Sequence, residues 1–285
     1  MELPDGDFVD LDITSTLSNA PTVLLLHGLE GSSASPYIRG MAATLKARGF
    51  RVIVMHFRGC SGAQNRLPRT YHSGDTADLG FVVQMLNDQY PSTPLALVGY
   101  SLGGNVVMKF LGEQADRAPI AAAVAISVPM VLAQCAQRLE HGLSRIYQWW
   151  LLRSLHRKLR SKPDDWHSSV KFSQVGKWRT FTAFDHNVTA PLHDFSSGAD
   201  YYAKSSGRQF LPSIRVPTLL LHSRDDPFMT HAVLPARTEL SRSVQFELSE
   251  TGGHVGFVYG TVPWRARYWL EERVPEFLDE FLPVK

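Results

Sequence analysis

Five short runs of the chain are apolar at almost every position. They span residues 22–28, 50–57, 94–100, 121–128 and 217–223. Strands that are buried on one face alternate polar and apolar residues, whereas strands of a parallel sheet covered by helices on both faces are apolar throughout. These runs therefore predict the central strands of a mostly parallel sheet.

Helical patterns lie between the apolar runs. In residues 35–49, Ile38, Met41 and Leu45 recur at spacings of three and four, and Gly49 is placed to end the helix. Residues 75–91 show a second pattern of this kind. Alternation of strand and helix predicts an α/β fold with a doubly wound sheet.

The alternation stops between about residues 129 and 212. We therefore expect residues 1–128 and 213–285 to form the two parts of one core, with residues 129–212 inserted as a helical cap. Within this insertion, residues 138–162 carry an apolar stripe at helical spacing. The stripe comprises Leu139, Leu143, Ile146, Tyr147, Trp150, Leu151, Leu155 and Leu159.

The same segment, residues 138–162, carries seven Lys or Arg and a single acidic residue, Glu140, so its net charge is about +6. A basic amphipathic helix can lie on an anionic membrane surface. The alternative is that the stripe covers a pocket for an acyl chain while the charges are solvated. We favour the alternative, because a long insertion needs to bury apolar surface against the core.

Composition adds little to this picture. The chain has 285 residues, a net charge of +2 and two cysteines, Cys60 and Cys135. The small charge gives no reason to expect nucleic-acid binding, and two cysteines do not form a disulfide framework. The acidic N-terminus does not resemble a signal peptide, and no apolar run reaches the length of a membrane span. We therefore expect a soluble, cytoplasmic protein.

The sequence Gly99-Tyr100-Ser101-Leu102-Gly103 matches the pattern G-x-S-x-G. It follows a predicted strand and opens a helical pattern. On such a sharp turn the serine adopts a strained backbone that exposes its hydroxyl, and the glycines avoid clashes with neighbouring elements. Ser101 is therefore the candidate nucleophile.

A serine nucleophile needs a base, and an acid that orients the base. His254 lies late in the chain in the Gly-rich stretch "ETGGHVGF", downstream of two candidate acids. Asp225 and Asp226 both follow the last predicted strand. We favour Asp226, because its distance from the strand end and the proline after it suit a triad acid, but Asp225 stays open.

The oxyanion of an acyl-transfer reaction needs two backbone N–H donors. Leu102, at the start of a helix, is the first candidate, and Leu29, in the loop "HGLEGSS", is the second. His27 stands too early in the chain for a triad base, so we expect it to support this loop. The histidines and acids show no metal-ligand spacing such as H-E-x-x-H, and we expect neither a metal nor a cofactor.

Several separated blocks give the chain a resemblance to the α/β-hydrolase superfamily, and more narrowly to its YheT-like esterases. The blocks are "DGDFVDLD", "LLLHGLEGSSASPY", "HFRGCSG", "YHSGDTADL", "VGYSLGGN", "TAPLHDF", "HSRDDPFM" and "GGHVGF". The resemblance implies an α/β-hydrolase fold and hydrolysis of carboxylic esters, with some relatives acting on phospholipids. It also implies Ser101, Asp226 and His254 as nucleophile, acid and base.

The resemblance leaves some residues and functions open. Cys60 is either an alternative nucleophile or, as we favour, a buried thiol. The partner we expect is a small-molecule ester with an apolar acyl group. Thioester hydrolysis, acyl transfer and carbon–carbon cleavage could use the same triad, and a non-catalytic binding protein could retain the fold. The sequence leaves the oligomeric state open.

Overall fold

A computed structural model describes residues 1–14, 19–164, 166, 169–260 and 266–283. Seven strands of this part form one sheet in the order β1-β3-β2-β4-β5-β6-β7. β1 runs antiparallel to β3, and the other neighbouring strands are parallel. The strands are β1 (Leu11–Ile13), β2 (Thr22–Leu26), β3 (Arg51–Met55), β4 (Leu95–Tyr100), β5 (Ala122–Ile126), β6 (Thr218–Ser223) and β7 (Val244–Ser249).

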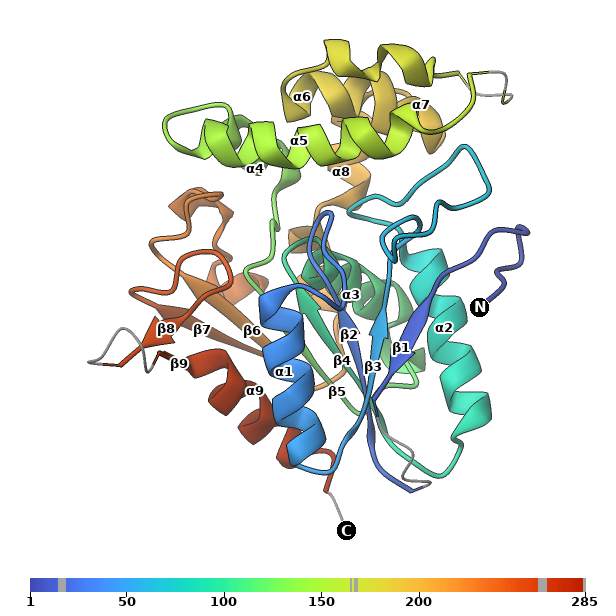
Figure 1. Ribbon diagram of the computed structural model, residues 1–285. Coiled ribbons are helices and arrows are strands. Elements are labelled where there is room, and N and C mark those ends of the chain that lie inside the picture. The colour runs from blue at the N-terminus through green and yellow to red at the C-terminus, as the bar shows by residue number, and fades with distance from the viewer. Residues whose placement is uncertain (15–18, 165, 167–168, 261–265, 284–285) are drawn as a thin grey trace.

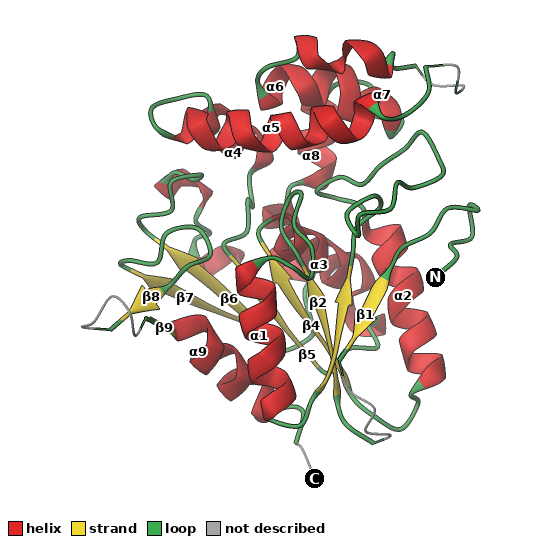
Figure 2. Cartoon of the chain, in the orientation of Figure 1, coloured by secondary structure: helices red, strands yellow, loops and turns green. Residues whose placement is uncertain are grey.

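The five predicted strands are all present, as β2 to β6, and every residue in them is buried. Alternate residues of each strand enter two separate apolar clusters, one on each face of the sheet. Helices α1 (Pro36–Ala47) and α9 (Trp269–Asp279) cover one face, and α2 (Thr76–Gln89) and α3 (Leu102–Gln114) cover the other (Figures 1 and 2). The predicted doubly wound α/β fold is confirmed.

A layer of helices lies above one end of the sheet, between β5 and β6 in the chain (Figure 1). Side chains such as Leu152, Phe172 and Val175 give it an apolar cluster of its own. The chain has returned to the core by Gly207, whose N–H donates to Asn105 Oδ1 at 2.8 Å. The layer comprises α4 (Leu132–Leu139), α5 (Ser144–Arg160), η2 (Phe172–Lys177), α6 (Phe181–Phe184), the π-helix η3 (Asp185–Thr189), α7 (Ala190–Leu192) and α8 (Gly198–Ser205), and η4 (Gly207–Ser213) follows it.

The prediction of one continuous apolar stripe over residues 138–162 is wrong. α4 ends at Leu139 and α5 begins at Ser144, with Gly142 at φ +57° in the turn between them. This turn resets the helical phase, so the apolar positions on its two sides no longer share a face. Leu151 and Leu159 are buried as expected, whereas the large apolar side chains at the start of α5 are exposed.

The remaining elements are short. They are η1 (Ala115–Arg117), η5 (His231–Val233), η6 (Arg237–Glu239), β8 (Val258–Tyr259) and β9 (Arg267–Tyr268). In the described ranges, no helix combines the length and the apolar character that a membrane crossing requires. The cytoplasmic location stays a prediction.

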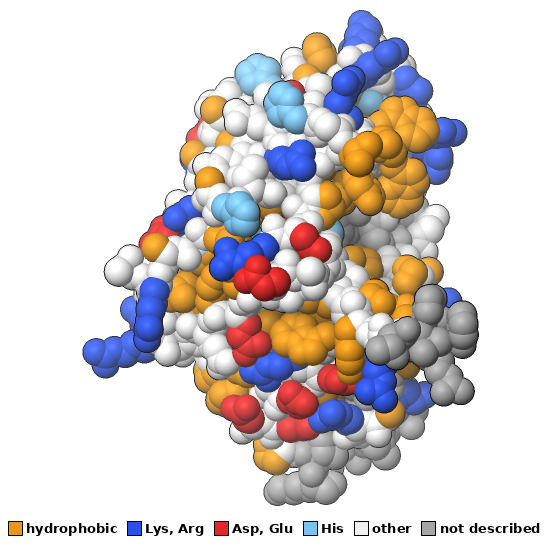
Figure 3. Space-filling view, turned by 90° about the vertical axis from the view of Figure 1, so that its left-hand side faces the viewer, with side chains coloured by type: hydrophobic (Ala, Val, Ile, Leu, Met, Phe, Trp, Pro, Cys, Tyr) orange, Lys and Arg blue, Asp and Glu red, His pale blue; other side chains and the backbone are white. Residues whose placement is uncertain are grey.

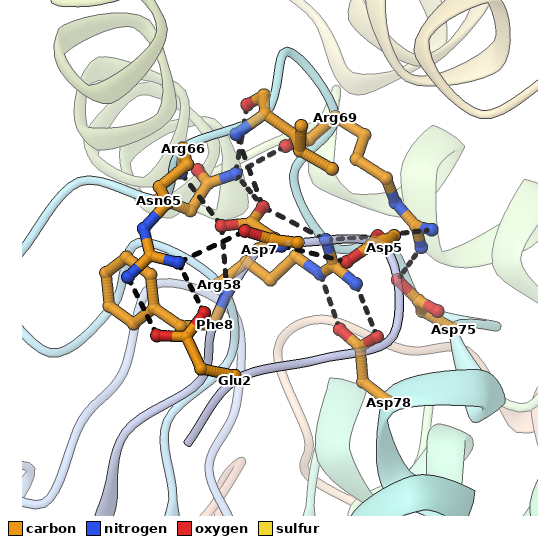
Figure 4. A network of polar contacts seen from close by, with 12 residues as sticks. Glu2, Asp5, Asp7, Phe8, Arg58, Asn65, Arg66, Arg69, Asp75 and Asp78 are labelled. Atoms are coloured by element: carbon orange, nitrogen blue, oxygen red, sulfur yellow. Dashed lines mark hydrogen bonds and ion pairs between the residues drawn. The ribbon is translucent and has the colours of Figure 1, made fainter.

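A buried ionic network joins the N-terminal segment to the loop after β3 and to the start of α2 (Figure 4). The Arg58 guanidinium, only 2% exposed, donates to both carboxylate oxygens of Asp78 at 2.6 Å and to Asp7 at 3.0 Å. Asn65 also donates to Asp7, at 2.7 Å. Three blocks that carry the family resemblance, at residues 5–12, 56–62 and 71–79, thus meet in one network that fixes the loops beside the site.

Candidate active site

The turn between β4 and α3 holds Ser101 in a strained conformation, with φ +51° and ψ −117°. The glycines on either side allow the close packing that this turn needs. A Cβ added at Gly99 would lie 2.5 Å from the carbonyl oxygen of Gly103, and one at Gly103 would lie 2.6 Å from that of Leu26. The predicted strain at the serine and the predicted role of the glycines are both confirmed.

The structure brings Ser101, His254 and Asp226 together. His254 Nε2 lies 2.8 Å from Ser101 Oγ, and His254 Nδ1 lies 2.8 Å from Asp226 Oδ2. The Asp226 side chain is 1% exposed, and its other oxygen accepts the N–H of Phe228 at 2.8 Å. Asp225 lies outside this chain of contacts and accepts the N–H of Gly253 at 2.8 Å instead.

These contacts define the tautomer of His254. A carboxylate can only accept, so the Asp226 contact places the imidazole proton on Nδ1 and leaves the lone pair of Nε2 facing the serine hydroxyl. The ring of Phe228 packs against the imidazole with the ring centroids 4.2 Å apart, which limits the access of water. In this arrangement the imidazole can take the proton of Ser101 and hold it beside a buried negative charge.

The two oxyanion candidates lie beside the serine. Leu29 and Leu102 both line the cavity that contains Ser101. In the part of the chain that the structure describes, neither backbone N–H has an acceptor. Leu102 opens α3, where the helix dipole favours negative charge. Gly28 brings the other loop close, because a Cβ there would lie 3.3 Å from Ser101 Cβ.

His27 supports the Leu29 loop, as expected. Its Nδ1–H donates to the carbonyl of Gly28 at 2.7 Å, and its Nε2 accepts the N–H of Phe57 at 3.2 Å. Burial lowers the pKa of His27 to about 3, so the ring is neutral and can play both roles at neutral pH.

Sequence reasoning missed Glu30, the residue after Leu29. Its backbone has a positive φ of 55°, and its side chain accepts from Lys158 at 2.6 Å and from Ser154 at 2.8 Å, both on α5. Tyr71 donates a further hydrogen bond to Glu30 at 2.9 Å. The loop that carries a candidate oxyanion donor is therefore tied to the helical layer. The only signal in the sequence is an acid inside the block "HGLEGS", because its partners on α5 lie more than a hundred residues away.

Cys60 lies in the same neighbourhood, with its Sγ 3.0 Å from Lys158 Nζ. Burial raises the pKa of the Cys60 thiol to about 11, although the Lys158 ammonium acts in the opposite direction. The thiol is thus protonated at neutral pH. A protonated thiol is a poor nucleophile, which argues against Cys60 as an alternative nucleophile, although Cys60 is half-buried and not fully buried as expected.

Ser101 and His254 open into a cavity of about 230 Å³. Its wall is mostly apolar and combines side chains from the core with others from α4, α5, α6 and α8. A smaller cavity of about 80 Å³ adjoins it and shares Leu29, Leu102, Asp185 and Tyr201. The apolar wall of the larger cavity includes Leu29, Leu132, Ala136, Leu139, Tyr147, Trp150, Leu151, Phe181, Phe228, Met229 and Val255.

One carboxyl group interrupts this apolar wall. Asp185 opens the π-helix η3 and accepts hydrogen bonds from the hydroxyls of Thr189 and Tyr202, each at 2.7 Å. Burial raises the pKa of Asp185 to about 6, although the two hydroxyls favour its charged form. Isolated π-helical turns often occur at functional sites. The sequence contains no signal that selects this aspartate from the others.

Among the described residues, one group has the donor types of a metal site. Nitrogen and oxygen atoms of His72, Asp75 and His193 lie within 4.8 Å of one another. Burial lowers the pKa of His72 to about 3, which keeps the ring neutral. The Asp75 carboxylate, however, already accepts from the Arg69 guanidinium at 3.0 Å, so its charge is balanced without a metal ion. The expectation of no metal stays a prediction.

The comparison with protein families decides the identity of the fold. A family model described as the alpha/beta hydrolase fold matches residues 21–261. The chain belongs to the α/β-hydrolase family.

Several relatives within this α/β-hydrolase family have names of enzymes that act on esters. YheT of Escherichia coli (strain K12), whose name gives esterase as a provisional activity, is 41% identical over 292 residues and is matched over 85% of its length. Human Phospholipase ABHD3 is 31% identical over 253 residues, which cover 88% of this chain and 62% of the phospholipase. The chain thus spans less than two thirds of that relative. The match to YheT covers all of this chain and makes it a YheT-like esterase, a carboxylic ester hydrolase.

Solved structures of other α/β hydrolases share the fold. The esterase Pf2001 of Pyrococcus furiosus superimposes with a TM-score of 0.63 over 99% of this chain and 90% of its own, at 18% identity. At that identity the likeness shows the fold alone.

Proposed function

We propose that this α/β hydrolase cleaves carboxylic esters with apolar acyl groups, using Ser101, His254 and Asp226 as its triad. Ser101 Oγ attacks the carbonyl carbon while its proton passes to His254 Nε2. The proton then goes to the departing alkoxide as the ester C–O bond breaks, leaving an acyl group on the serine. Water, deprotonated by the same imidazole, attacks this acyl-enzyme and releases the acid.

The other groups of the site assist these two steps. The Asp226 carboxylate holds the imidazole in its reactive tautomer and stabilises the imidazolium that forms. The backbone N–H groups of Leu29 and Leu102 bind the negative oxygen of the tetrahedral intermediates. Because both donors are fixed before the substrate arrives, little reorganisation is needed when the charge develops.

The substrate class follows from the cavity beside Ser101. Its wall is mostly apolar and carries one carboxyl group, that of Asp185, so it suits an acyl chain better than a sugar or a peptide. We also propose that residues 129–212 act as the cap of this pocket, because α4, α5, α6 and α8 supply much of its wall. The phospholipase relative and a yeast relative named Monoacylglycerol lipase, 30% identical over 270 residues, fit a lipid-like ester.

The continuous contact from Asp226 through His254 to Ser101, at the mouth of an apolar cavity, is the observation that carries this proposal. The test is a panel of p-nitrophenyl esters of rising chain length, assayed beside acyl-CoA thioesters. We expect ester hydrolysis that improves with chain length and falls by roughly 10⁴ in Ser101→Ala.

Three results of this panel would contradict the proposal. If Ser101→Ala kept a tenth of the activity, Ser101 would not be the nucleophile. Faster turnover of thioesters than of oxygen esters would favour the thioesterase alternative. A fully inert wild-type protein would favour a non-catalytic binding protein.

A further inference from the structure

The first half of α5 has its polar and apolar side chains on unexpected sides. Ser144 and Gln148 face inward, where Ser144 Oγ donates to the carbonyl of Pro227 at 2.6 Å and Gln148 Oε1 accepts the N–H of Phe181 at 2.9 Å. The large apolar side chains face solvent. We call them the α5 patch: Leu143 (80% exposed), Ile146 (63%), Tyr147 (48%), Trp149 (58%) and Trp150 (60%).

Packing within the chain gives no reason for the α5 patch. The inward polar groups are satisfied, so the orientation of the helix is well determined, yet it leaves five large apolar side chains between 48% and 80% exposed. Scattered apolar residues are ordinary on a protein surface, but a contiguous group of this size marks an interaction site. Figure 3 shows hydrophobic side chains gathered on the upper part of the molecule, with Lys and Arg around them.

The α5 patch is continuous with the pocket. Tyr147 and Trp150 line the cavity that contains Ser101. The Tyr147 ring packs against Phe228 at 4.9 Å between centroids, and Phe228 packs against His254 at 4.2 Å. The α5 patch therefore borders the cavity that contains the triad.

Positive charge surrounds the α5 patch. Beside it, an open groove is lined by Trp149, by His156 and by four arginines: Arg153, Arg157, Arg160 and Arg179. Within the described residues no acidic side chain pairs with these arginines or with Arg145. The Arg153 guanidinium lies 5.3 Å from the Trp149 ring centroid. Unpaired arginines beside exposed aromatic rings suit a partner that is both anionic and apolar.

We propose that the α5 patch docks this enzyme on the surface of an anionic phospholipid bilayer. The aromatic and aliphatic side chains enter the boundary between headgroups and acyl chains, and the arginines of the groove bind lipid phosphates. Self-association through this face is disfavoured, because it would bring unpaired arginines of two copies together. Docking goes beyond ester hydrolysis and does not depend on Ser101.

The test is co-sedimentation with vesicles, using Ser101→Ala so that no lipid is consumed. One set of vesicles is phosphatidylcholine alone, and the other contains equal parts of phosphatidylcholine and phosphatidylglycerol. The apolar variant carries Leu143→Gln, Ile146→Gln and Trp149→Gln, and the charge variant carries Arg145→Glu, Arg153→Glu and Arg157→Glu. The matched control places the same charge change on exposed arginines elsewhere: Arg117→Glu, Arg237→Glu and Arg242→Glu.

We expect binding to the anionic vesicles at low salt that weakens at high salt. Each arginine near anionic headgroups contributes roughly fivefold to binding, and each Arg→Glu change also adds a repelled charge, so the charge variant should lose at least about a hundredfold. The apolar variant should lose at least about tenfold at either salt concentration, and the control variant should bind nearly as the parent does. None of the substituted side chains lines the pocket, so restoring Ser101 in each variant should restore hydrolysis of a short soluble ester and show that the fold is intact.

Other outcomes overturn the proposal. Equal binding to both kinds of vesicle, or none to either, excludes an anionic bilayer as the partner. Equal losses in the control and charge variants would mean that net charge alone attracts the protein. Full binding by the apolar variant would mean that the exposed rings take no part. If the parent elutes as a dimer that the apolar variant abolishes, and neither binds vesicles, the patch is an interface between copies. Docking can fail in these ways while ester hydrolysis stands, because the two are measured separately.

Discussion

The turn that carries Ser101 and the outer face of α5 meet at one pocket, but they differ in how their side chains are partnered. At the turn, the serine hydroxyl, both nitrogens of His254 and both oxygens of Asp226 have partners within the protein. On the outer face of α5, large apolar side chains are exposed, and among the described residues several arginines have no acidic partner. A region with all its partners inside the molecule is organised before substrate arrives, whereas an unpartnered region is suited to bind something else.

We expect the largest effect from removing the acid of the triad, Asp226, whose two oxygens both have partners within the protein. Asp226→Asn should lower turnover by roughly 10³–10⁴, because an amide favours the wrong tautomer of His254. Asp225→Asn is the matched control, since an asparagine oxygen can still accept the N–H of Gly253. Steady-state turnover of a p-nitrophenyl ester measures both variants. If Asp225→Asn were the more damaging change, the acid would be the wrong residue.

The second test compares a buried arginine with an exposed one. Arg58→Met should lower the free energy of unfolding by about 3–5 kcal/mol, because it leaves the carboxylates of Asp7 and Asp78 buried without their cation. Arg66→Met removes an exposed pair with Glu2 and should cost at most about 1 kcal/mol. Urea unfolding measures both. Equal costs would show that the Figure 4 network does not fix the loops.

Glu30 links the loop beside Ser101 to α5, so its substitution should disturb the arrangement of the active site. Glu30→Gln weakens the contact with Lys158 and loosens the loop of Leu29. We expect turnover to fall roughly ten- to a hundredfold with little change in KM, since a misplaced oxyanion donor affects the transition state more than substrate binding. The control is Glu113→Gln on α3, which is paired with Lys109. A change in KM alone would make Glu30 a determinant of the pocket shape instead.

The smallest effects are on the pH dependence of stability. They come from two buried groups, Asp185 and His72, whose pKa values are shifted in opposite directions. The folded pKa of Asp185 is raised to about 6 by burial, so its contribution to stability is full at low pH and is lost as pH rises from about 4 to about 6. Burial lowers the pKa of His72 to about 3, so its contribution is full above about pH 6.5 and is lost as pH falls below that value.

Two variants test these signs. Relative to the parent, Asp185→Asn should gain stability as pH rises through that window, and His72→Asn should gain stability as pH falls. Each change amounts to at most about 1.4 kcal/mol per pH unit. Urea unfolding at a series of pH values measures it, and His231→Asn, at an exposed position, should follow the parent. Parallel curves for all four proteins would show that neither group titrates differently in the folded state.

The core could be predicted from the sequence because its signal is local. A strand buried on both faces is apolar throughout, and Gly99 and Gly103 mark the sharp turn around Ser101 within five residues. The chain order of serine, acid and histidine then leads to His254, although local pattern alone leaves Asp225 and Asp226 in competition.

The helical layer could not be predicted in the same way. An apolar stripe reports helical spacing but not which neighbour covers each side chain. The turn at Gly142 resets the phase, and the hydrogen bonds of Ser144 and Gln148 then turn the polar side of α5 inward. Glu30 was missed for a related reason, because its partners on α5 come close only after folding.

The role of Ser101 as nucleophile is tested most sharply by the site of covalent labelling by a fluorophosphonate, read by mass spectrometry of the digested protein. We expect one adduct, on the peptide that contains Ser101, and loss of ester hydrolysis in proportion to labelling. His254→Ala should react far more slowly, because the serine then has no base. An adduct on any other residue, or hydrolysis that survives complete labelling of Ser101, would show that Ser101 is not the nucleophile.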